Sequence, residues 1–306
     1  MPSLWMLFAS FAFAAMGAAV KLASGTFSTS ELLMYRGLIG TVILLATVRH
    51  QGGTFQTRFP KEHLWRSFVG VTSLWLWFYA IGTLPLATAV TLNYMAPIWM
   101  AAALFALGLW RGEKHVEWPL ALAILMSFAG VTLVLQPAVE TNQWLGGLSG
   151  VVSSVVSAMA YMQVRRLGMM GEPEYRVVFY FSLTTTIAGF CMALATPDAD
   201  GVAFHAISAE GAALLLAIGV SALLAQMAMT RAYRVGKVLV VANLQYTGIV
   251  FSSLWGMLLW GDRFDWHVWL GIGVILASGI AATFYNNRNA ARIAASVKQT
   301  ATPSAR

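Results

Sequence analysis

Ten long apolar stretches are the feature that most limits what this chain can fold into. Each has about 18 to 24 residues, and a helix rising ~1.5 Å per residue needs about that length to cross a hydrocarbon core of ~30 Å. The stretches lack the alternating pattern of barrel strands, so we expect an all-α membrane protein with ten transmembrane helices. They run over Leu4–Ala23, Glu31–Val48, Trp65–Leu84, Ala87–Trp110, Trp118–Gln136, Leu145–Val164, Val177–Thr196, Glu210–Thr230, Val238–Trp260 and Trp266–Tyr285.

The overall composition excludes a water-soluble globule. Of the 306 residues, 58% are hydrophobic and only 10% are charged, which leaves too little polar surface to face water. The first apolar stretch has no basic segment before it and is longer than the core of a usual secretory signal, so we expect it to remain as the first span. The lipid bilayer is therefore the expected surrounding of the chain.

The basic residues lie mainly on one side when the ten spans are drawn with the N-terminus in the cytoplasm. This asymmetry is typical of a bacterial-type inner membrane protein with both termini cytoplasmic, and it argues against a nucleic-acid partner despite the net charge of +7. The cytoplasmic side holds sixteen of the 19 Lys and Arg residues, namely Arg49, Arg58, Lys61, Arg66, Arg111, Lys114, Arg165, Arg166, Arg176, Arg231, Arg234, Lys237, Arg288, Arg292, Lys298 and Arg306.

A faint internal repeat divides the chain into two halves of five spans. At an offset of about 149 residues, Leu, Gly and Gly recur in register, and an acidic residue follows the first Gly of each half. Because five is odd, the second half must be inserted upside down relative to the first. The alternative is chance matching of abundant residue types. The matched residues are Leu109, Gly112, Glu113 and Gly130 with Leu258, Gly261, Asp262 and Gly279.

The repeat predicts a simple domain organisation. Residues 1–140 form the first five-helix repeat and residues 141–286 form the second. Residues 287–306 form a basic cytoplasmic tail, which is either flexible or a short helix at the anionic inner leaflet.

Short motifs in the first half carry a resemblance to a known family. They are Leu-Met-Tyr-Arg-Gly at 33–37, Leu-Pro-Leu-Ala-Thr-Ala at 84–89, Asn-Tyr-Met-Ala-Pro at 93–97 and Gly-Glu at 112–113, with Ala-Tyr-Arg-Val-Gly at 232–236 in the second half. With them the chain resembles the drug/metabolite transporter superfamily, and within it the ten-span EamA-type exporters. The resemblance covers nearly everything before residue 286. It departs from the family pattern where Tyr246 stands at the place equivalent to Pro97 and where Asp262 replaces Glu.

The resemblance implies a cavity lined by spans 1, 3, 4, 6, 8 and 9, and it implies export. Polar side chains inside spans are the candidates for substrate contact, because a polar group at membrane depth must face protein or a wet cavity. The repeat offset pairs Trp77 with Gln226 and Tyr94 with Asn243. For each residue the alternative is a hydrogen bond between helices. The candidate substrate-binding residues are Trp77, Tyr79, Asn93, Tyr94, Tyr161, Gln226, Asn243, Gln245 and Tyr246.

Arg36 is the one formal charge that we expect to be buried. It lies about six residues inside the second span, and it either extends outward to the headgroups near Glu31 or joins Lys21 in attracting a substrate carboxylate. All twelve acidic residues fall in loops or at span ends, which argues against a proton relay at mid-membrane and against proton-coupled export of organic cations.

The chemistry of an enzyme is missing from the sequence. The five histidines are scattered over loops and span ends, and no metal-ligand spacing, paired carboxylates or phosphate-binding Gly-rich loop is present. We therefore expect no metal and no cofactor, and no fixed oligomeric state, a monomer being compatible with the sequence. The predicted function is a secondary transporter that exports small organic metabolites by alternating access, foremost amino acids including hydrophobic and aromatic ones.

Two other functions stay open from the sequence. One is a broad-specificity drug or metabolite efflux carrier. The other is a non-transporting scaffold or signalling protein, which the small residues Gly248, Ser252 and Gly256 in one span would also suit, because they allow close contact between helices.

Overall fold

The computed structural model describes residues 2–84, 86–110, 118–136, 144–197, 202–261 and 263–301, and over these ranges it contains helices and no strand. Pro85, Gly112, Glu113 and Asp262, as well as the predicted junction of the repeats near residue 140, lie outside the described residues. The helices are α1 (Pro2–Ala23), α2 (Thr29–His50), α3 (Pro60–Thr83), α4 (Leu86–Asn93), α5 (Ala96–Trp110), α6 (Trp118–Leu135), α7 (Trp144–Met169), α8 (Glu174–Ala195), α9 (Ala209–Val235), α10 (Val238–Gln245), α11 (Thr247–Trp260) and α12 (Trp266–Ala301).

The described part of the chain offers nine segments that are long and apolar enough to cross a membrane. Nine of the ten predicted spans fall on these segments. The remaining one, the third predicted span Trp65–Leu84, falls on α3. This helix has 24 residues and carries Lys61, Glu62 and Arg66 near its start, and it is not among the nine segments. The last predicted span ends at Tyr285, whereas α12 continues as a helix to Ala301.

Two of the predicted spans are not single helices. The fourth is divided into α4 and α5, and the ninth is divided into α10 and α11. Each division falls well inside the apolar stretch, which is unusual because an unpaired backbone group in lipid is costly. The structure thus adds a short break within the fourth and the ninth predicted spans, and both breaks lie in the candidate site described below.

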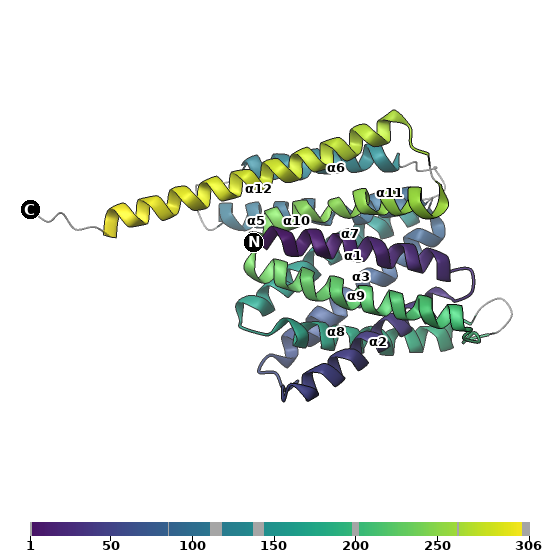
Figure 1. The fold of residues 1–306 in the computed structure, drawn as a ribbon. Coiled ribbons are helices and arrows are strands. Elements are labelled where there is room, and N and C mark those ends of the chain that lie inside the picture. Colours follow the sequence, from purple (N-terminus) through teal and green to yellow (C-terminus); the bar gives the residue numbers. More distant parts are fainter. Residues whose placement is uncertain are drawn as a thin grey trace, which may run out of the picture.

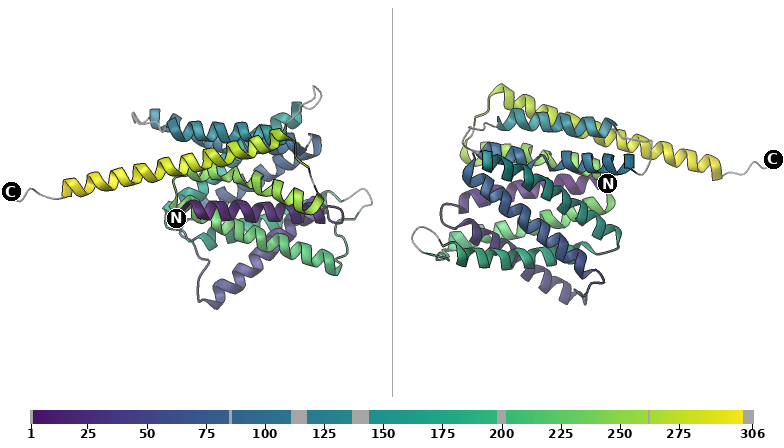
Figure 2. Two further views of the ribbon diagram at one scale, coloured as in Figure 1. Left: turned by 45° about the horizontal axis from the view of Figure 1, so that its top comes forward. Right: turned by 180° about the vertical axis from the view of Figure 1, so that it is seen from behind.

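The helices pack in a pattern that pairs the two halves. Helix α1 packs on α9, and α3 packs on α7. The first helix of each half therefore contacts the third helix of the other half. Helices α2 and α8 lie side by side at one edge of the bundle, and α6 and α12 lie side by side at the opposite edge (Figure 1). Two further views show the same two pairs and the end of α12 projecting from the bundle (Figure 2).

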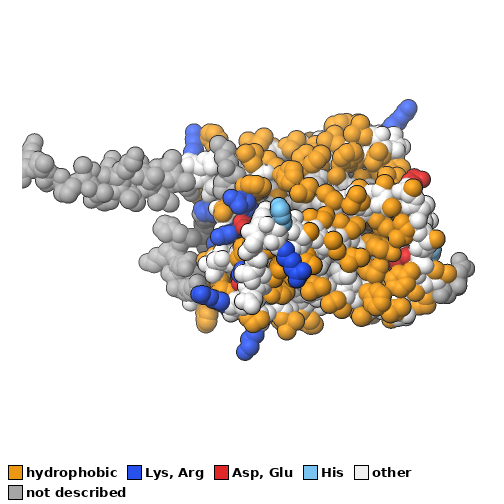
Figure 3. All heavy atoms as spheres, turned by 60° about the horizontal axis from the view of Figure 1, so that its bottom comes forward, with side chains coloured by type: hydrophobic (Ala, Val, Ile, Leu, Met, Phe, Trp, Pro, Cys, Tyr) orange, Lys and Arg blue, Asp and Glu red, His pale blue; other side chains and the backbone are white. Residues whose placement is uncertain are grey.

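Both chain termini lie at the same end of the bundle, which we call the terminal end; the other is the far end (Figure 1). Hydrophobic side chains cover most of the long face drawn in Figure 3, and most of the Lys and Arg side chains on that face gather towards the terminal end. Arg49 in the last turn of α2, Arg58 in the following connection and Arg166 in the last turn of α7 lie at this end. An apolar face with one basic end is what a protein embedded in a bilayer presents.

The core of the bundle lies around α10. Every residue from Val238 to Leu244 is buried, so this short helix is surrounded by protein on all sides. Its neighbours in the main cluster of buried apolar residues come from α1, α5, α6, α7, α9 and α12. The centre of the molecule is thus built from both halves.

Glycines allow α2 and α8 to approach closely. A Cβ atom added to Gly37 would lie 2.6 Å from the carbonyl oxygen of Ser182 and 2.7 Å from the backbone nitrogen of Thr186, and one added to Gly189 would lie 2.6 Å from the backbone nitrogen of Met34. Real Cβ atoms do not approach backbone atoms so closely, so any larger residue must separate the helices. Small residues at such crossings are typical of helix pairs in membranes.

Replacing Gly37 with alanine should therefore lower the thermal stability of the protein in detergent, with a cost of about 1–3 kcal/mol for overpacking. The matched control is Gly17→Ala, because Gly17 is exposed in α1 and a Cβ added there would meet nothing within 4 Å. The control should be neutral or gain up to about 1 kcal/mol from helix propensity. Equal melting temperatures of the two variants would contradict the close packing of α2 and α8.

Candidate functional site

The candidate site begins at the two helix breaks. Pro97 follows the first break, and because proline has no N–H, the carbonyl group of Asn93 loses its helical partner. The chain passes through a tighter turn there, in which the Met95 N–H donates to the Leu92 carbonyl at 3.1 Å. This division therefore has a visible cause in the sequence.

The second break, at Tyr246, has no proline. The Tyr246 N–H donates to the Asn243 carbonyl at 3.2 Å, again a tight turn. Two hydroxyl groups donate hydrogen bonds to the Leu244 carbonyl at this break. The donors are Thr247 Oγ1 at 2.6 Å and Ser10 Oγ of α1 at 3.4 Å. Side-chain hydroxyls that satisfy freed carbonyls are the means by which membrane helices tolerate such breaks.

Five side chains around the two breaks form what we call the aromatic–amide cluster: Tyr94, Tyr161, Tyr233, Gln245 and Tyr246. Gln245 Nε2 donates to the Tyr161 hydroxyl at 3.3 Å, and the Tyr233 hydroxyl donates to Gln245 Oε1 at 3.3 Å. The rings of Tyr161 and Tyr233 stack with centroids 5.8 Å apart, and those of Tyr94 and Tyr246 stack with centroids 6.0 Å apart. The cluster joins residues of both halves.

Two residues, one in this cluster and one beside it, have side-chain polar groups without a hydrogen-bond partner among the described residues. Asn243 is 1% exposed, and neither its Oδ1 nor its Nδ2 is bonded. Tyr246 is fully buried, and its hydroxyl is also unbonded. Leaving such a buried group unsatisfied costs about 1–3 kcal/mol, so these positions are poorly explained by stability alone. A polar ligand that reached them would remove the cost.

The expectation that Arg36 is the only buried charge is wrong. Arg66 is 3% exposed, Glu172 is 2% exposed and Glu31 is fully buried. Each of them lies within two turns of a helix end, where the sequence indicates a solvated charge, but the opposite half packs over that end. Arg36 itself lines a narrow cleft together with Phe181 and Gln226.

The other predicted residues are more scattered. Gln226 is buried in the cleft with Arg36, and Trp77 and Asn93 are half-buried in α3 and at the end of α4. Tyr79 is 52% exposed on the outer face of α3, away from the enclosed cluster. Lys21 is exposed, and its ammonium group lies 4.1 Å from the centroid of the Trp260 ring.

Sequence reasoning missed Tyr233 and Arg66. Tyr233 lies seven residues after Gln226 in α9, so the two share one helix face, and that spacing could have revealed it. Arg66 was counted among the basic residues of the cytoplasmic side, at the start of the predicted span Trp65–Leu84. Nothing in the local sequence shows that α7 and α8 cover this part of α3.

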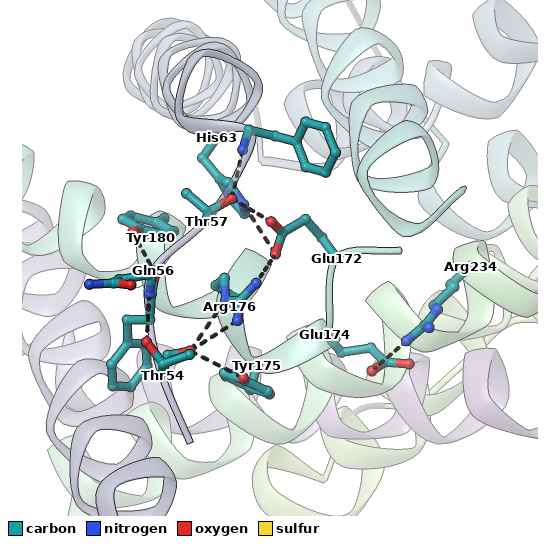
Figure 4. Close-up of polar contacts among 12 residues, drawn as sticks. Thr54, Gln56, Thr57, His63, Glu172, Glu174, Tyr175, Arg176, Tyr180 and Arg234 are labelled. Carbon is teal, nitrogen blue, oxygen red and sulfur yellow. Dashed lines mark hydrogen bonds and ion pairs between the residues drawn. The ribbon is translucent and has the colours of Figure 1, made fainter. Parts of the chain in front are cut away.

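At the terminal end, a buried carboxylate ties the two halves together (Figure 4). Glu172, in the turn before α8, accepts hydrogen bonds from Thr57 Oγ1 and, at 2.9 Å, from Arg176 Nη1. Its Oε2 lies 3.7 Å from His63 Nε2. Thr57 and His63 belong to the first half, whereas Glu172 and Arg176 belong to the second. We call these four residues the terminal-end latch.

Further bonds hold the connection between α2 and α3 against α8 in the same place. Arg176 Nη2 donates to the Thr54 carbonyl at 3.1 Å, and the Tyr175 hydroxyl donates to the same carbonyl at 3.2 Å. The Tyr180 hydroxyl donates to the Phe55 carbonyl at 2.8 Å. Beside them, Arg166 of α7 pairs with Glu62 of α3 at 2.9 Å.

A second buried carboxylate ties the halves at the far end. Glu31, in the first turn of α2, accepts a hydrogen bond from the His205 N–H at 2.7 Å, and its Oε2 lies 2.8 Å from His205 Nδ1. Glu31 also completes a capping box with Ser28. We call Glu31 and His205 the far-end latch. His205 lies in the connection between α8 and α9, so this contact again joins one half to the other.

The terminal-end latch predicts a pH effect on stability. Burial lowers the pKa of the His63 imidazole below its ordinary value, while the Glu172 carboxylate opposes this shift and Arg176 adds to it. Tyr180 covers the imidazole with ring centroids 4.7 Å apart. Because the unfolded imidazole has the higher pKa, the unfolded chain binds more protons, and stability falls as the pH drops through about 6.5 and below.

We expect the melting temperature to fall less in the variant His63→Gln than in the wild type between about pH 7.5 and about pH 5, since glutamine does not titrate. Differential scanning fluorimetry of the two purified proteins measures this difference directly. Identical pH profiles would show that the imidazole has the same pKa in the folded and unfolded chains.

Comparison with known proteins identifies the family. A model of the EamA-like transporter family matches residues 1–136. The pseudopaline exporter of Pseudomonas aeruginosa (strain UCBPP-PA14) is 33% identical over 257 residues, which cover 83% of this chain and 86% of the exporter. The chain belongs to the EamA-like transporter family. The riboflavin transporter of Vibrio cholerae serotype O1, 28% identical over 95% of each chain, is a further relative of this EamA-like transporter.

A solved crystal structure shares the fold, with a TM-score of 0.79, 18% sequence identity and coverage of 94% of this chain and 98% of the other. The resemblance predicted from the motifs is thus confirmed. This EamA-like transporter is a multi-pass membrane protein with a small-molecule substrate, and it is not an enzyme.

Proposed function

We propose that this EamA-like transporter exports amino acids and related small metabolites across a bacterial-type inner membrane by alternating access. In this proposal the chain crosses the membrane ten times: once with each of the nine apolar segments and once with α3. Residues 1–140 and 141–286 are five-helix repeats of opposite insertion, and residues 287–306 form a basic extension at the cytoplasmic surface. The terminal end of the bundle faces the cytoplasm.

The orientation is supported by the positions of the termini and the charges. Both termini at one end require an even number of crossings (Figure 1). The same end carries most of the basic side chains visible in Figure 3, as expected for a cytoplasmic face. Helix α1 packs on α9 and α3 packs on α7, which is the pattern that two inverted repeats produce.

The observation that carries the mechanism is the pair of latches. Glu172 precedes the second helix of the second half and holds the connection between the second and third helices of the first half. Glu31 lies in the first turn of the second helix of the first half and holds the corresponding connection of the second half. The two contacts are thus equivalent under exchange of the halves, and they close opposite ends. A carrier that opens one end at a time needs such a pair.

The substrate class rests on the aromatic–amide cluster. Its stacked tyrosines suit an apolar or aromatic side chain, and the unbonded amide of Asn243 and hydroxyl of Tyr246 suit the polar groups of an amino acid. The names of the relatives, a pseudopaline exporter and a riboflavin transporter, agree with a small organic substrate. Family membership favours a carrier over a scaffold.

Counterflow in proteoliposomes tests this function. Vesicles loaded with an unlabelled amino acid should take up the labelled one transiently, with phenylalanine and tryptophan among the amino acids that exchange. Protein-free vesicles and vesicles with heat-denatured protein are the controls. Absence of counterflow for all twenty amino acids in wild-type vesicles would refute the proposed substrate class.

A further inference from the structure

Arg66 is a buried cation for which no carboxylate partner exists among the described residues. It is 3% exposed, and its Nε and Nη1 atoms have no hydrogen-bond partner. Glu62, one turn earlier on the same helix, already pairs with Arg166 and accepts a hydrogen bond from Gln163. A buried guanidinium with unbonded N–H groups is unfavourable, so this position is suited to bind an anion.

The surroundings hold the Arg66 side chain in one place. Its guanidinium carbon lies 4.2 Å from the centroid of the Phe181 ring, where the π-face favours a cation. Gly70 gives room on the other side, because a Cβ atom there would lie 2.3 Å from Arg66 Nη1 and 2.7 Å from the Phe181 ring. The side chain is therefore preorganised, although no carboxylate in the described ranges neutralises it.

A second cation approaches the same place from another helix. Arg36 of α2 lines the cleft to which Phe181 also contributes, with Gln226 beside them. Both arginines thus lie at Phe181, because Arg66 packs against its ring and Arg36 lines the same cleft as that residue. Two cations that approach one ring repel each other, and an anion bound between them would reverse that repulsion.

We propose that Arg66 and Arg36 bind a carboxylate of the transported metabolite, and that the protein consequently selects organic acids and amino acids with net negative charge over their neutral analogues. This inference rests on the proposed function, since it assigns the substrate class of the same enclosed site. Arginine is suited to this task because its planar fork matches a carboxylate with two parallel hydrogen bonds. The aromatic–amide cluster would then receive the rest of the molecule.

Binding to the purified protein in nanodiscs tests the proposal with three pairs of probes that differ in charge but little in shape: succinate and succinamide, glutamate and glutamine, benzoate and benzamide. At equal ionic strength, at least one carboxylate should raise the melting temperature while its amide does not. Arg66→Gln should weaken that binding by about 30-fold or more, as expected when one partner of a buried charge pair is removed.

Two further variants separate binding from misfolding. Arg58→Gln removes an exposed arginine from the neighbouring connection and should bind as the wild type does. Arg66→Lys keeps the charge without the fork, so it should bind more weakly yet still prefer the carboxylate to the amide. The proposal is overturned if no carboxylate of the panel binds better than its amide, or if Arg66→Gln retains the preference of the wild type.

Counterflow distinguishes this failure from failure of the proposed function. If amino acids exchange equally well through wild type and Arg66→Gln, the arginine site is refuted and transport stands. If carboxylates bind in the Arg66-dependent manner but nothing crosses the membrane, the site stands and transport is refuted.

Discussion

Replacing Glu172 with glutamine is expected to cut transport at least tenfold while leaving the protein folded. Glutamine keeps the size of the side chain but loses its charge, so Arg176 and Thr57 lose a carboxylate acceptor that is only 2% exposed. If the change weakens closure of the terminal end by about 2 kcal/mol, the population open at that end rises about 30-fold. A carrier held open on one side cannot complete its cycle.

The matched control is Glu174→Gln. Glu174 lies two residues further along the chain at the same end, but its partners Arg231 and Arg234 belong to the same half, at 3.5 Å and 3.1 Å. It closes no gap between the halves, so transport should stay within about twofold of the wild type, although the ion pair itself is partly buried. Equal loss of counterflow in both variants would show that Glu172 has no special role as a latch.

The second large effect is expected at Asn243, where stability and transport should change in opposite directions. Leucine has nearly the shape of asparagine, and the amide of Asn243 has no partner in the described structure. Asn243→Leu should therefore stabilise the protein, by about 1–3 kcal/mol if the full cost of an unsatisfied buried group is recovered. Counterflow should nevertheless fall at least tenfold, because the variant lacks the polar atoms offered to the substrate.

Gln163→Leu provides the contrasting case. Gln163 is another buried amide, but it donates a hydrogen bond to Glu62. Its replacement should lower the melting temperature, since a buried bond to a charged group is lost. A lower melting temperature for Asn243→Leu, or undiminished counterflow, would mean that Asn243 is a structural residue.

Much of the fold could be predicted because lipid imposes one strong rule, a long apolar helix for each crossing. The breaks in the fourth and ninth spans were harder to predict from the sequence. Pro97 gives a local reason for the first, but the second at Tyr246 depends on hydroxyl groups from Ser10 and Thr247 that only the folded structure brings to the Leu244 carbonyl.

Part of the candidate site could be predicted because the internal repeat pairs equivalent positions of the two halves. Pairing Tyr94 with Asn243 led to two positions at the breaks, and Tyr161, Gln245 and Tyr246 do lie together in the structure. Whether these residues bind substrate remains a prediction.

The latches could not be predicted, because each depends on a contact between residues more than one hundred positions apart. Glu172 and Glu31 lie at helix ends, where isolated carboxylates are usually solvated. Only the packing of one half over the helix ends of the other buries them.

The central claim, that two equivalent latches open in turn, is tested most directly by distances between spin labels across each end. In a Cys191→Ser background, which removes the only cysteine, labels at the exposed positions 56 and 169 report on the terminal end. Labels at the exposed positions 24 and 207 report on the far end. Glu172→Gln should lengthen the first distance and leave the second short, and Glu31→Gln should do the reverse. Lengthening of both distances together in either variant would contradict alternating access between the two halves.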